Sequence, residues 1–287
     1  MLSVFAEGIL PWESVEVLIT DNEFLKLSQY IRDNIGIDLS EKKKNLLSSR
    51  LGMVIETGKF GSFSAYYDYV VSDKTGKAIN QLIDKITTNH TYFYREKQHY
   101  EYLTSDVLPY LVNTNKDHRD LRIWSAGCSS GEEPYTIAMV LADFLGNRKT
   151  LWDSKILATD ISNKVLTKAK EGIYTEENLK NNPPLWNYKY FKPQEDEKFV
   201  ISDPIKKEVI FRRLNLLSPF NFKKKFHIIF CRNVMIYFDA PTRNNLVKKF
   251  YDILEPGGYF FISHSESIDR NITGFKYVKP SIYRKEI

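Results

Sequence analysis

Three carboxylates follow two apolar stretches that have the pattern of parallel strands. Glu132 and Glu133 end a loop of small residues that begins at Gly127, and Asp160 ends the next apolar stretch. Small side chains let a ligand approach the backbone closely. A pyrophosphate at the following helix start would meet two negative charges, so a neutral or cationic cofactor fits better. An acid at the end of a second strand is typical of folds that hold a ribose diol.

S-adenosylmethionine has the groups that suit these carboxylates. It carries a sulfonium cation, an ammonium group and a ribose diol, and it has no phosphate. Glu133 could pair with the ammonium group or a hydroxyl, and Asp160 could hold the ribose. The alternative is that Glu132 and Glu133 only stabilise the helix start by complementing its dipole. The local pattern leaves both interpretations open.

Other chemistries have weaker support in the sequence. A nicotinamide dinucleotide is disfavoured because the loop has no GxGxxG pattern. Cys128 and Cys231 have no evident histidine base, which favours small buried thiols over nucleophiles. Two isolated cysteines without a CxxC pattern predict a reducing compartment and no metal site.

The elements that must position these residues alternate between strand and helix over residues 115–287, which predicts an α/β domain with a mostly parallel sheet. Ligands of such sheets bind beyond the carboxyl ends of the strands. We expect strands at 121–126, 155–160, 208–214, 226–230, 259–262 and around 277–283. The loops expected at the ligand edge are 127–133, 160–162, 215–217 and 232–237.

Two segments depart from this alternation. Residues 173–206 predict a small antiparallel β insertion, with short strands at 189–191 and 198–201. Residues 89–114 predict a linker and a connecting helix that Pro109 interrupts.

The N-terminal part has a different composition. Residues 21–88 carry four short helical patterns that predict an all-helical domain around one core, with Ser40 and Ser62 as N-caps. Residues 1–20 carry little periodic signal and are expected to be an extension.

Charge and hydropathy exclude several classes of function. The 287 residues carry a formal net charge of +5, which falls short of the concentrated basic stripe of a dedicated nucleic-acid binder. The N-terminus lacks the pattern of a signal peptide, and no segment approaches the roughly 20 apolar residues that span a bilayer. We therefore expect a cytoplasmic protein without membrane insertion.

Six blocks of the sequence, in the same order, resemble the CheR-type chemotaxis receptor methyltransferases, over about residues 21–285. The blocks are TTNHTYFYRE (87–96), WSAGCSSGEEPYTIA (124–138), ATDIS (158–162), LNLL (214–217), FCRNVMIYF (230–238) and GGYFFISHSES (257–267). The resemblance implies a Rossmann-like domain that uses S-adenosylmethionine, a helical N-terminal domain and a small inserted β subdomain. It also implies methyl transfer to glutamate side chains of the chemoreceptors' cytoplasmic helical domain, with S-adenosylhomocysteine as the second product.

The resemblance also implies which residues form the site. Arg95 and Tyr237 would flank the transferable methyl group. The cofactor contacts would be Asn89, Thr91, Arg95, Glu133, Asp160, Asn215, Leu216, Asn233 and Val234.

These residue types suit the reaction. A glutamate carboxylate is already an anionic nucleophile at neutral pH, so transfer needs alignment and desolvation but no general base. We expect Arg95 to orient the carboxylate through charge-assisted hydrogen bonds. Tyr237 would position the acceptor oxygen or line the methyl site; its alternative is an ordinary half-buried aromatic residue.

Receptor recognition is expected at basic residues of the N-terminal domain. Lys42, Lys43, Lys44 and Arg50 share one helical pattern, for which a solvated face is the default interpretation. The resemblance implies a receptor contact at Arg50, whereas Glu56 stands where further basic character is expected. The insertion's PQEDE turn (193–197) lacks the glycines of family members that tether a receptor's C-terminal pentapeptide, so we expect no such tether.

Two alternatives remain open. Methylation of an amino group commonly uses an Asn/Asp-Pro-Pro-aromatic loop, and Asn182–Leu185 reads NPPL. That motif lies at the entry to the insertion and has no aromatic residue after the prolines. The second alternative is a regulator that binds S-adenosylmethionine without catalysis; the presence of both Arg95 and Tyr237 argues against it.

Overall fold

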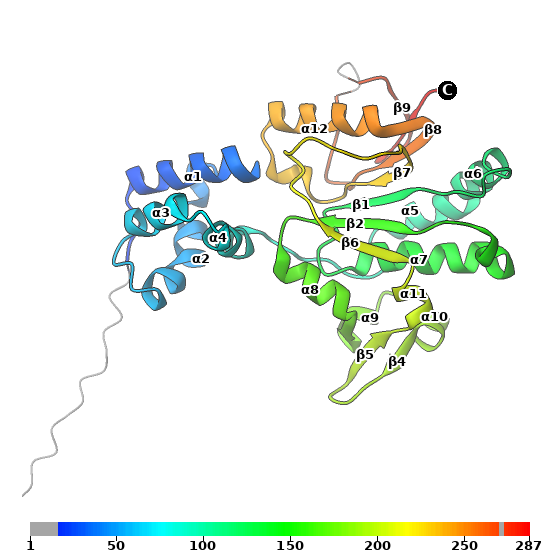
Figure 1. Ribbon diagram of the computed structural model, residues 1–287, viewed down its shortest axis with the longest axis horizontal. Helices are drawn as coiled ribbons and strands as arrows, with labels where there is room; N and C mark the ends of the chain where they lie inside the picture. Colours follow the sequence, from blue (N-terminus) through cyan, green and yellow to red (C-terminus); the bar gives the residue numbers. More distant parts are fainter. Residues whose placement is uncertain (1–16, 270–272) are drawn as a thin grey trace, which may run out of the picture. The chain divides into compact units, whose positions relative to one another are not determined.

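The computed structural model of the protein describes residues 17–269 and 273–287, which divide into two units (Figure 1). The first unit contains the described residues up to Gln29 together with Leu39–Ile86. The second contains Tyr30–Asp38 and Thr87–Ile287, so the division passes through the first helix. None of the helices in these described ranges is long and apolar enough to cross a membrane.

The first unit is a small helical domain. Its elements are the first part of α1 (Asp21–Ile35), a 3₁₀ turn (Glu41–Lys43), α2 (Lys44–Thr57), α3 (Phe63–Ser72) and α4 (Lys77–Ile86). Fully buried side chains from all four helices form the core, including Leu27, Leu51, Phe63 and Leu82. Four amphipathic helices thus cover one another's apolar faces, as the sequence predicts.

The two predicted N-caps of this unit behave differently. The Ser62 side chain accepts a hydrogen bond from the N–H of Ala65 and caps α3, as predicted. The prediction for Ser40 is wrong, because its side chain makes no capping hydrogen bond. A 3₁₀ turn separates Ser40 from α2, so the serine lies too far from the orphan N–H groups of that helix.

The second unit is built on a seven-stranded sheet in the order β6-β2-β1-β7-β8-β10-β9 (Figure 1). The first five strands in this order pair in parallel, and β10 pairs antiparallel with both β8 and β9. The strands are β1 (Ile123–Ala126), β2 (Ile156–Asp160), β6 (Val209–Arg213), β7 (Phe226–Phe230), β8 (Leu254–Phe261), β9 (Phe275–Lys279) and β10 (Ile282–Lys285). The predicted mostly parallel sheet is confirmed. The single last strand expected around 277–283 is instead a hairpin of two antiparallel strands, β9 and β10.

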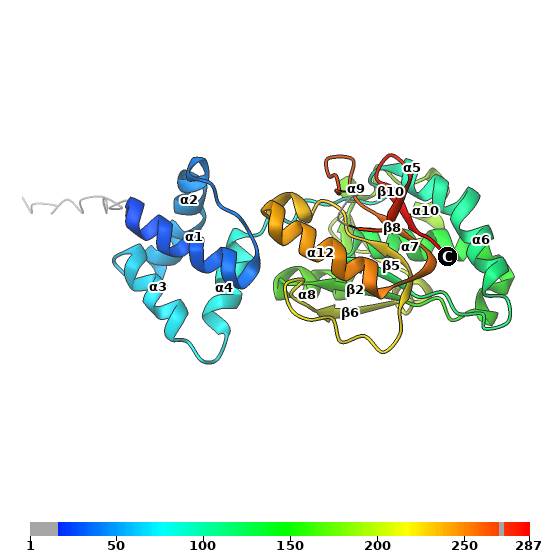
Figure 2. The ribbon, with the colours of Figure 1, turned by 90° about the horizontal axis from the view of Figure 1, so that it is seen from above.

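Helices cover both faces of this sheet. On one face lie α5 (Lys97–Tyr102), α6 (Leu108–Thr114), α7 (Glu132–Leu145) and α8 (Asn163–Glu171); on the other lies α12 (Ala240–Ile253) (Figures 1 and 2). Neighbouring side chains of one strand therefore enter different cores: Ile228 packs with α7 residues and Ile229 with α12 residues. Burial on both faces explains why β7 is a continuous apolar run.

The connecting helix contains the predicted interruption. A π-helical segment (Leu103–Val107) joins α5 to α6, and Pro109 stands in the first turn of α6. Proline has no N–H to donate to the preceding turn, so a local change of helical hydrogen bonding here has a physical cause.

Residues 173–206 contain a second sheet of three antiparallel strands, β3-β5-β4. The strands are β3 (Ile173–Thr175), β4 (Phe191–Pro193) and β5 (Lys198–Ile201), and the helices are α9 (Glu176–Leu179), α10 (Pro184–Tyr190) and α11 (Asp203–Lys206). The sequence predicts a strand at 189–191, but Lys189 and Tyr190 end α10. Pro184, suited to a first helical turn, opens this helix.

Candidate active site

The loops after β1 and β2 are joined through Asp160. Its Oδ2 accepts the Ser129 N–H at 2.9 Å, and its Oδ1 accepts the Ser162 N–H at 3.0 Å. The backbone thereby fixes the carboxylate at the carboxyl edge of the sheet, which is the position expected of a ribose ligand. Ser162 also caps α8, as its Oγ accepts the Val165 N–H.

Gly127 lets the first loop approach the loop after β7. Its φ is +83°, and a Cβ atom at this position would lie 2.3 Å from Cγ2 of Val234. Only glycine meets both conditions without strain. The predicted cofactor contact Val234 thus lies directly against the small-residue loop.

Glu133, in the first turn of α7, is held from two sides. Its Oε1 accepts the Ser125 hydroxyl at 2.7 Å, and its Oε2 accepts Nη1 of Arg232 at 3.1 Å. Burial raises the pKa of Glu133, and the nearby guanidinium opposes that shift. Glu132 is also buried, and it accepts the Ser130 hydroxyl rather than simply facing solvent at the helix start.

Arg232 is the centre of the site's charge network, and sequence reasoning missed it. The side chain is only 2% exposed. It donates to Glu133, to Glu96 Oε2 at 2.9 Å and to the Tyr100 hydroxyl at 3.1 Å, and also to the backbone oxygen of Arg95. The available sequence signal was a cation two residues after the apolar run of β7. Two half-buried carboxylates share this one guanidinium, which leaves the three groups with a formal charge of −1 and suits a cationic cofactor.

Glu266, the second residue that sequence reasoning missed, fixes the loop after β7. Its carboxylate accepts the backbone N–H groups of Asn233, Val234, Met235 and Ser263 at 2.8–3.2 Å. Asn233 has a positive φ of 59°, and its side chain donates to the Ser263 hydroxyl. This anchoring sets the positions of both predicted cofactor contacts of the loop.

The linker before α5 contacts the first loop. Oγ of Ser129 donates to the backbone oxygen of Asn89 at 2.9 Å. The side chain of Phe93, fully buried, packs edge-on against Tyr174 and Phe191. Arg95 follows on the same linker, so the candidate catalytic arginine belongs to a segment tied to the cofactor loops.

The linker backbone is strained near Arg95. Tyr94 and Glu96 both have positive φ values, 59° and 57°. Such conformations are uncommon for non-glycine residues and persist where surrounding contacts impose them. Here the contacts are those of Glu96 with Arg232 and with the Ser263 hydroxyl.

The loop after β6 carries Asn215 and Leu216. The Asn215 side chain accepts the Leu217 N–H and donates to the backbone oxygen of Asn34. Nζ of Lys249 donates to the carbonyl groups of Leu216 at 2.6 Å, Leu217 at 3.2 Å and Ser218 at 2.7 Å. A lysine of α12 therefore holds the turn that contains both predicted contacts.

Tyr237 ends the 3₁₀ turn Met235–Tyr237 and is half-buried. Its backbone oxygen accepts the Asp38 N–H at 2.8 Å, so the turn is tied to the segment after α1. Arg50, by contrast, belongs to the helical unit, where its guanidinium donates to the carbonyl oxygen of Ile86 at the end of α4.

Two family models match most of the chain. Residues 89–284 match the model described as "CheR methyltransferase, SAM binding domain", and residues 22–87 match "CheR methyltransferase, all-alpha domain". The chain belongs to the CheR methyltransferase family. It is therefore an S-adenosylmethionine-dependent methyltransferase of the chemotaxis type, as the sequence resemblance implies.

Individual CheR relatives match over most of their length. A chemotaxis protein methyltransferase of Borreliella burgdorferi is 45% identical over 95% of this chain and 97% of its own. The chemotaxis protein methyltransferase of Escherichia coli K12 is 36% identical over 87% of this chain and 85% of its own. Among solved structures, PKMT2 from Rickettsia typhi with AdoHcy is 16% identical, covers 50% of this chain and 21% of its own, and gives a TM-score of 0.32.

A cluster beside the CheR site has side chains of metal-ligand type. One ligand atom each from Glu96, His99 and His264 lie within 4.8 Å of one another. However, Oε2 of Glu96 already accepts a hydrogen bond from the Arg232 guanidinium, and Oε1 accepts one from the Ser263 hydroxyl at 2.7 Å. Because these bonds occupy the carboxylate, we assign Glu96 to the arginine network rather than to a metal.

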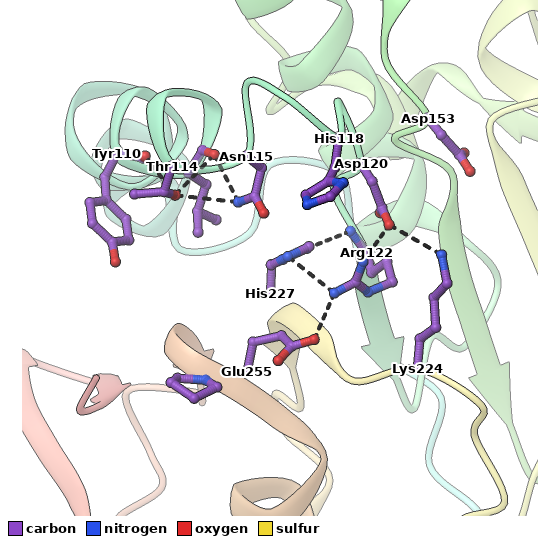
Figure 3. A pocket seen from close by; sticks show the side chains of 12 residues that line it. Tyr110, Thr114, Asn115, His118, Asp120, Arg122, Asp153, Lys224, His227 and Glu255 are labelled. Atoms are coloured by element: carbon purple, nitrogen blue, oxygen red, sulfur yellow. Dashed lines mark hydrogen bonds and ion pairs between the residues drawn. The ribbon is translucent and has the colours of Figure 1, made fainter.

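A pocket of about 700 Å³ lies away from these loops (Figure 3). It is found where β1, β7 and β8 begin, the edge opposite the carboxyl ends that carry the site. Arg122 pairs there with Asp120 and with Glu255 at 2.7 Å, and Nδ1 of His227 accepts the Arg122 N–H. The charged groups at the centre of the pocket, Arg122, Asp120 and Glu255, are paired with one another. We therefore interpret the pocket as the location of a structural ion-pair network and not as a second candidate site.

Proposed function

We propose that this chain transfers the methyl group of S-adenosylmethionine to glutamate side chains in the cytoplasmic helical domain of chemoreceptors, forming glutamyl methyl esters. The observation that carries the proposal is the placement of Arg95. Arg95 lies on a linker whose backbone is bonded to the site: the Asn89 carbonyl accepts the Ser129 hydroxyl of the first loop, and the Arg95 carbonyl accepts the Arg232 guanidinium. The Arg95 guanidinium itself donates to the His90 carbonyl. A fixed guanidinium suits a carboxylate acceptor, because it can bind both oxygens at once.

The residues present fit the cofactor. Gly127 allows close backbone approach, Asp160 is held by the Ser129 N–H at the carboxyl end of β2, and Glu133 shares the Arg232 guanidinium with Glu96. The other proposed contacts are Asn89, Thr91, Arg95, Asn215, Leu216, Asn233 and Val234. When bound, S-adenosylmethionine supplies an electrophilic methyl group on a sulfonium centre. We propose that no metal takes part.

The chain's own residues would align the acceptor. Arg95 holds the glutamate carboxylate by charge-assisted hydrogen bonds, and Tyr237 orients the reacting oxygen or lines the methyl site. Transfer of the methyl group to that oxygen would leave S-adenosylhomocysteine as the second product. A carboxylate is ionised at neutral pH, so no residue needs to remove a proton.

The structure disfavours the amino-methylating alternative. Asn182 donates to the Asn187 side chain, and Pro183 and Pro184 begin α10 within the insertion. The NPPL motif is therefore not one of the loops at the carboxyl ends of β1, β2, β6 and β7. The loop after β7, which would carry such a motif, contains no proline between Cys231 and Tyr237.

We also propose that the enzyme works in the cytoplasm and meets the receptor partly through Arg50, without nucleic-acid partners. We do not extend the proposal to a receptor tail. In the turn between β4 and β5, Asp196 and Glu197 both have positive φ, so non-glycine residues hold left-handed conformations. That turn differs from the glycine-containing turn expected of a tethering subdomain.

The deciding experiment is incubation of the full chain with labelled S-adenosylmethionine and receptor cytoplasmic fragments. We expect base-labile label on glutamate, and fragments with those glutamates changed to alanine as the control should stay unlabelled. Base-stable label on nitrogen would favour the amino-methylating alternative. Cofactor binding without transfer would favour the regulator.

A further inference from the structure

Arg95 is held by a neighbour on its own linker. Its Cζ atom lies 5.4 Å from the centroid of the Tyr92 ring, and its Nη1 donates to the backbone oxygen of His90 at 3.0 Å. The His90 and Tyr92 rings are 6.0 Å apart. Tyr92 and Arg95 are half-buried, whereas His90 is exposed.

This arrangement restricts the guanidinium from two directions. The carbonyl of His90 fixes one nitrogen, and the Tyr92 ring lies within the distance at which a cation is attracted to an aromatic face. An arginine side chain otherwise loses considerable rotamer freedom when it binds a carboxylate. A guanidinium already held by a ring loses less, and its planar fork stays aligned.

The backbone next to these residues is itself fixed. Phe93, which follows Tyr92 in the chain, is fully buried, and Tyr94 has a positive φ. Glu96, two residues further on, is anchored by the hydrogen bond that it accepts from the Ser263 hydroxyl. The ring of Tyr92 therefore projects from a rigid linker rather than from a loose loop. A rigid support is what a positioning residue requires.

We propose that Tyr92 is a positioning residue for methyl transfer: its ring holds the Arg95 guanidinium in the orientation that receives the acceptor carboxylate. This inference rests on the proposed function, because it assigns Arg95 to the acceptor. The ring face makes the contact, so phenylalanine can replace tyrosine and an aliphatic residue of similar size cannot.

The test compares Tyr92→Phe and Tyr92→Leu in the full chain, with initial rates of label transfer to receptor fragments. We expect Tyr92→Phe to stay near the wild-type kcat/KM and Tyr92→Leu to lower it roughly two- to fivefold, the range of an exposed to partly buried cation–π contact. Tyr188→Leu is the matched control, since Tyr188 is 89% exposed on α10. Thermal unfolding should be similar for all three variants.

A double-mutant cycle separates positioning from a general loss of structure. In an Arg95→Gln background, measured in single turnover with excess enzyme, Tyr92→Leu should change the rate by less than about 1.5-fold. Equal losses for the Phe and Leu variants would overturn the inference, as would a Leu effect that persists in the Arg95→Gln background. A wild-type enzyme that labels no receptor glutamate would instead refute the proposed function, so the two failures are distinguishable.

Discussion

Nη1 of Arg232 lies 3.1 Å from Oε2 of Glu133, and the same guanidinium bonds Glu96. One buried cation therefore joins three segments: the first turn of α7, the loop after β7 and the linker that carries Arg95. Removal of one partner of a buried ion pair leaves an uncompensated charge, which costs more than the pair itself contributes.

Arg232→Met should therefore destabilise the protein by about 3–5 kcal/mol, because Glu96 and Glu133 would lose their buried counter-charge. Urea unfolding followed by circular dichroism measures this loss. Adding Glu96→Gln to Arg232→Met removes one of the unpaired charges and should restore part of the stability. If the double variant is less stable than Arg232→Met, charge compensation is not the function of this arginine.

Gly127→Ala should impair cofactor binding through a collision. The new Cβ would lie 2.3 Å from Val234 Cγ2, so one of two cofactor loops must shift. Gly61→Ala is a matched control, since Gly61 has a similar φ of +73° and a Cβ atom added there would meet no other atom within 4 Å. Both variants should lose roughly 1 kcal/mol or more to backbone strain, but only Gly127→Ala should raise the Kd for S-adenosylhomocysteine, measured calorimetrically. Equal affinities would show that the loop absorbs the methyl group.

Sequence patterns predicted much of this fold because its signals are local. The buried run of β7 depends only on neighbouring residues, and the strand occurs where it is expected. Arg232 and Glu266 could not be assigned in this way. Arg232 bonds Glu96, which lies 136 residues earlier, and Glu266 serves N–H groups more than 30 residues before it. Such partners become visible only when the strands are ordered in space.

Short elements were the other source of error. Lys189 and Tyr190 belong to the predicted strand 189–191, yet they end α10, where the Tyr190 hydroxyl and Lys189 Nζ both bond Asp143 of α7. Tertiary contacts of this kind override weak β propensity. The predicted site residues Asn89, Glu133, Asp160, Asn215, Asn233 and Val234 lie in the loops that the sequence assigns to the carboxyl edge or in the linker bonded to them; their contacts with cofactor stay predictions.

Lys249→Met should weaken cofactor binding. Its ammonium group bonds three successive carbonyls of the turn that follows Asn215 and lies 4.1 Å from the Phe220 ring centroid. Methionine keeps the length of the side chain and loses these bonds. Loss of three charge-assisted hydrogen bonds outweighs the benefit of removing a half-buried charge. We expect about a tenfold rise in the Kd for S-adenosylhomocysteine. The neighbouring Lys248 is exposed, so Lys248→Met should leave the Kd unchanged. A similar rise in both variants would show that the Lys249 hydrogen bonds do not support cofactor binding.

Stability should fall as the solution is acidified, partly because of His99. Burial lowers the pKa of His99 to about 3, and the adjacent Arg232 acts in the same direction. Between this value and the unfolded pKa of about 6.5 the unfolded chain binds more protons, so the contribution is complete above about pH 6.5 and is lost towards pH 3. His99→Leu should reduce the slope of unfolding free energy against pH in this window by up to about 1.4 kcal/mol per pH unit. The exposed His118 provides the control, and a slope that His118→Gln changes as much as His99→Leu would contradict the assignment.

Arg50 offers a choice between recognition and structure. Its guanidinium donates to the carbonyl of Ile86 at the end of α4, an interaction that stabilises a helix terminus. If Arg50 also meets an acidic receptor helix, Arg50→Glu should raise the KM for receptor fragments about tenfold and leave the Kd for S-adenosylhomocysteine unchanged, because like charges would then face each other. Arg50→Gln keeps a hydrogen-bond donor for Ile86 and should give a smaller rise in the KM.

A purely structural role of Arg50 gives a different result. Both variants would then lower the unfolding temperature, and the KM for receptor fragments would not depend on the charge at position 50. Steady-state kinetics at two ionic strengths completes the test, since a receptor contact through charge must weaken as salt is added.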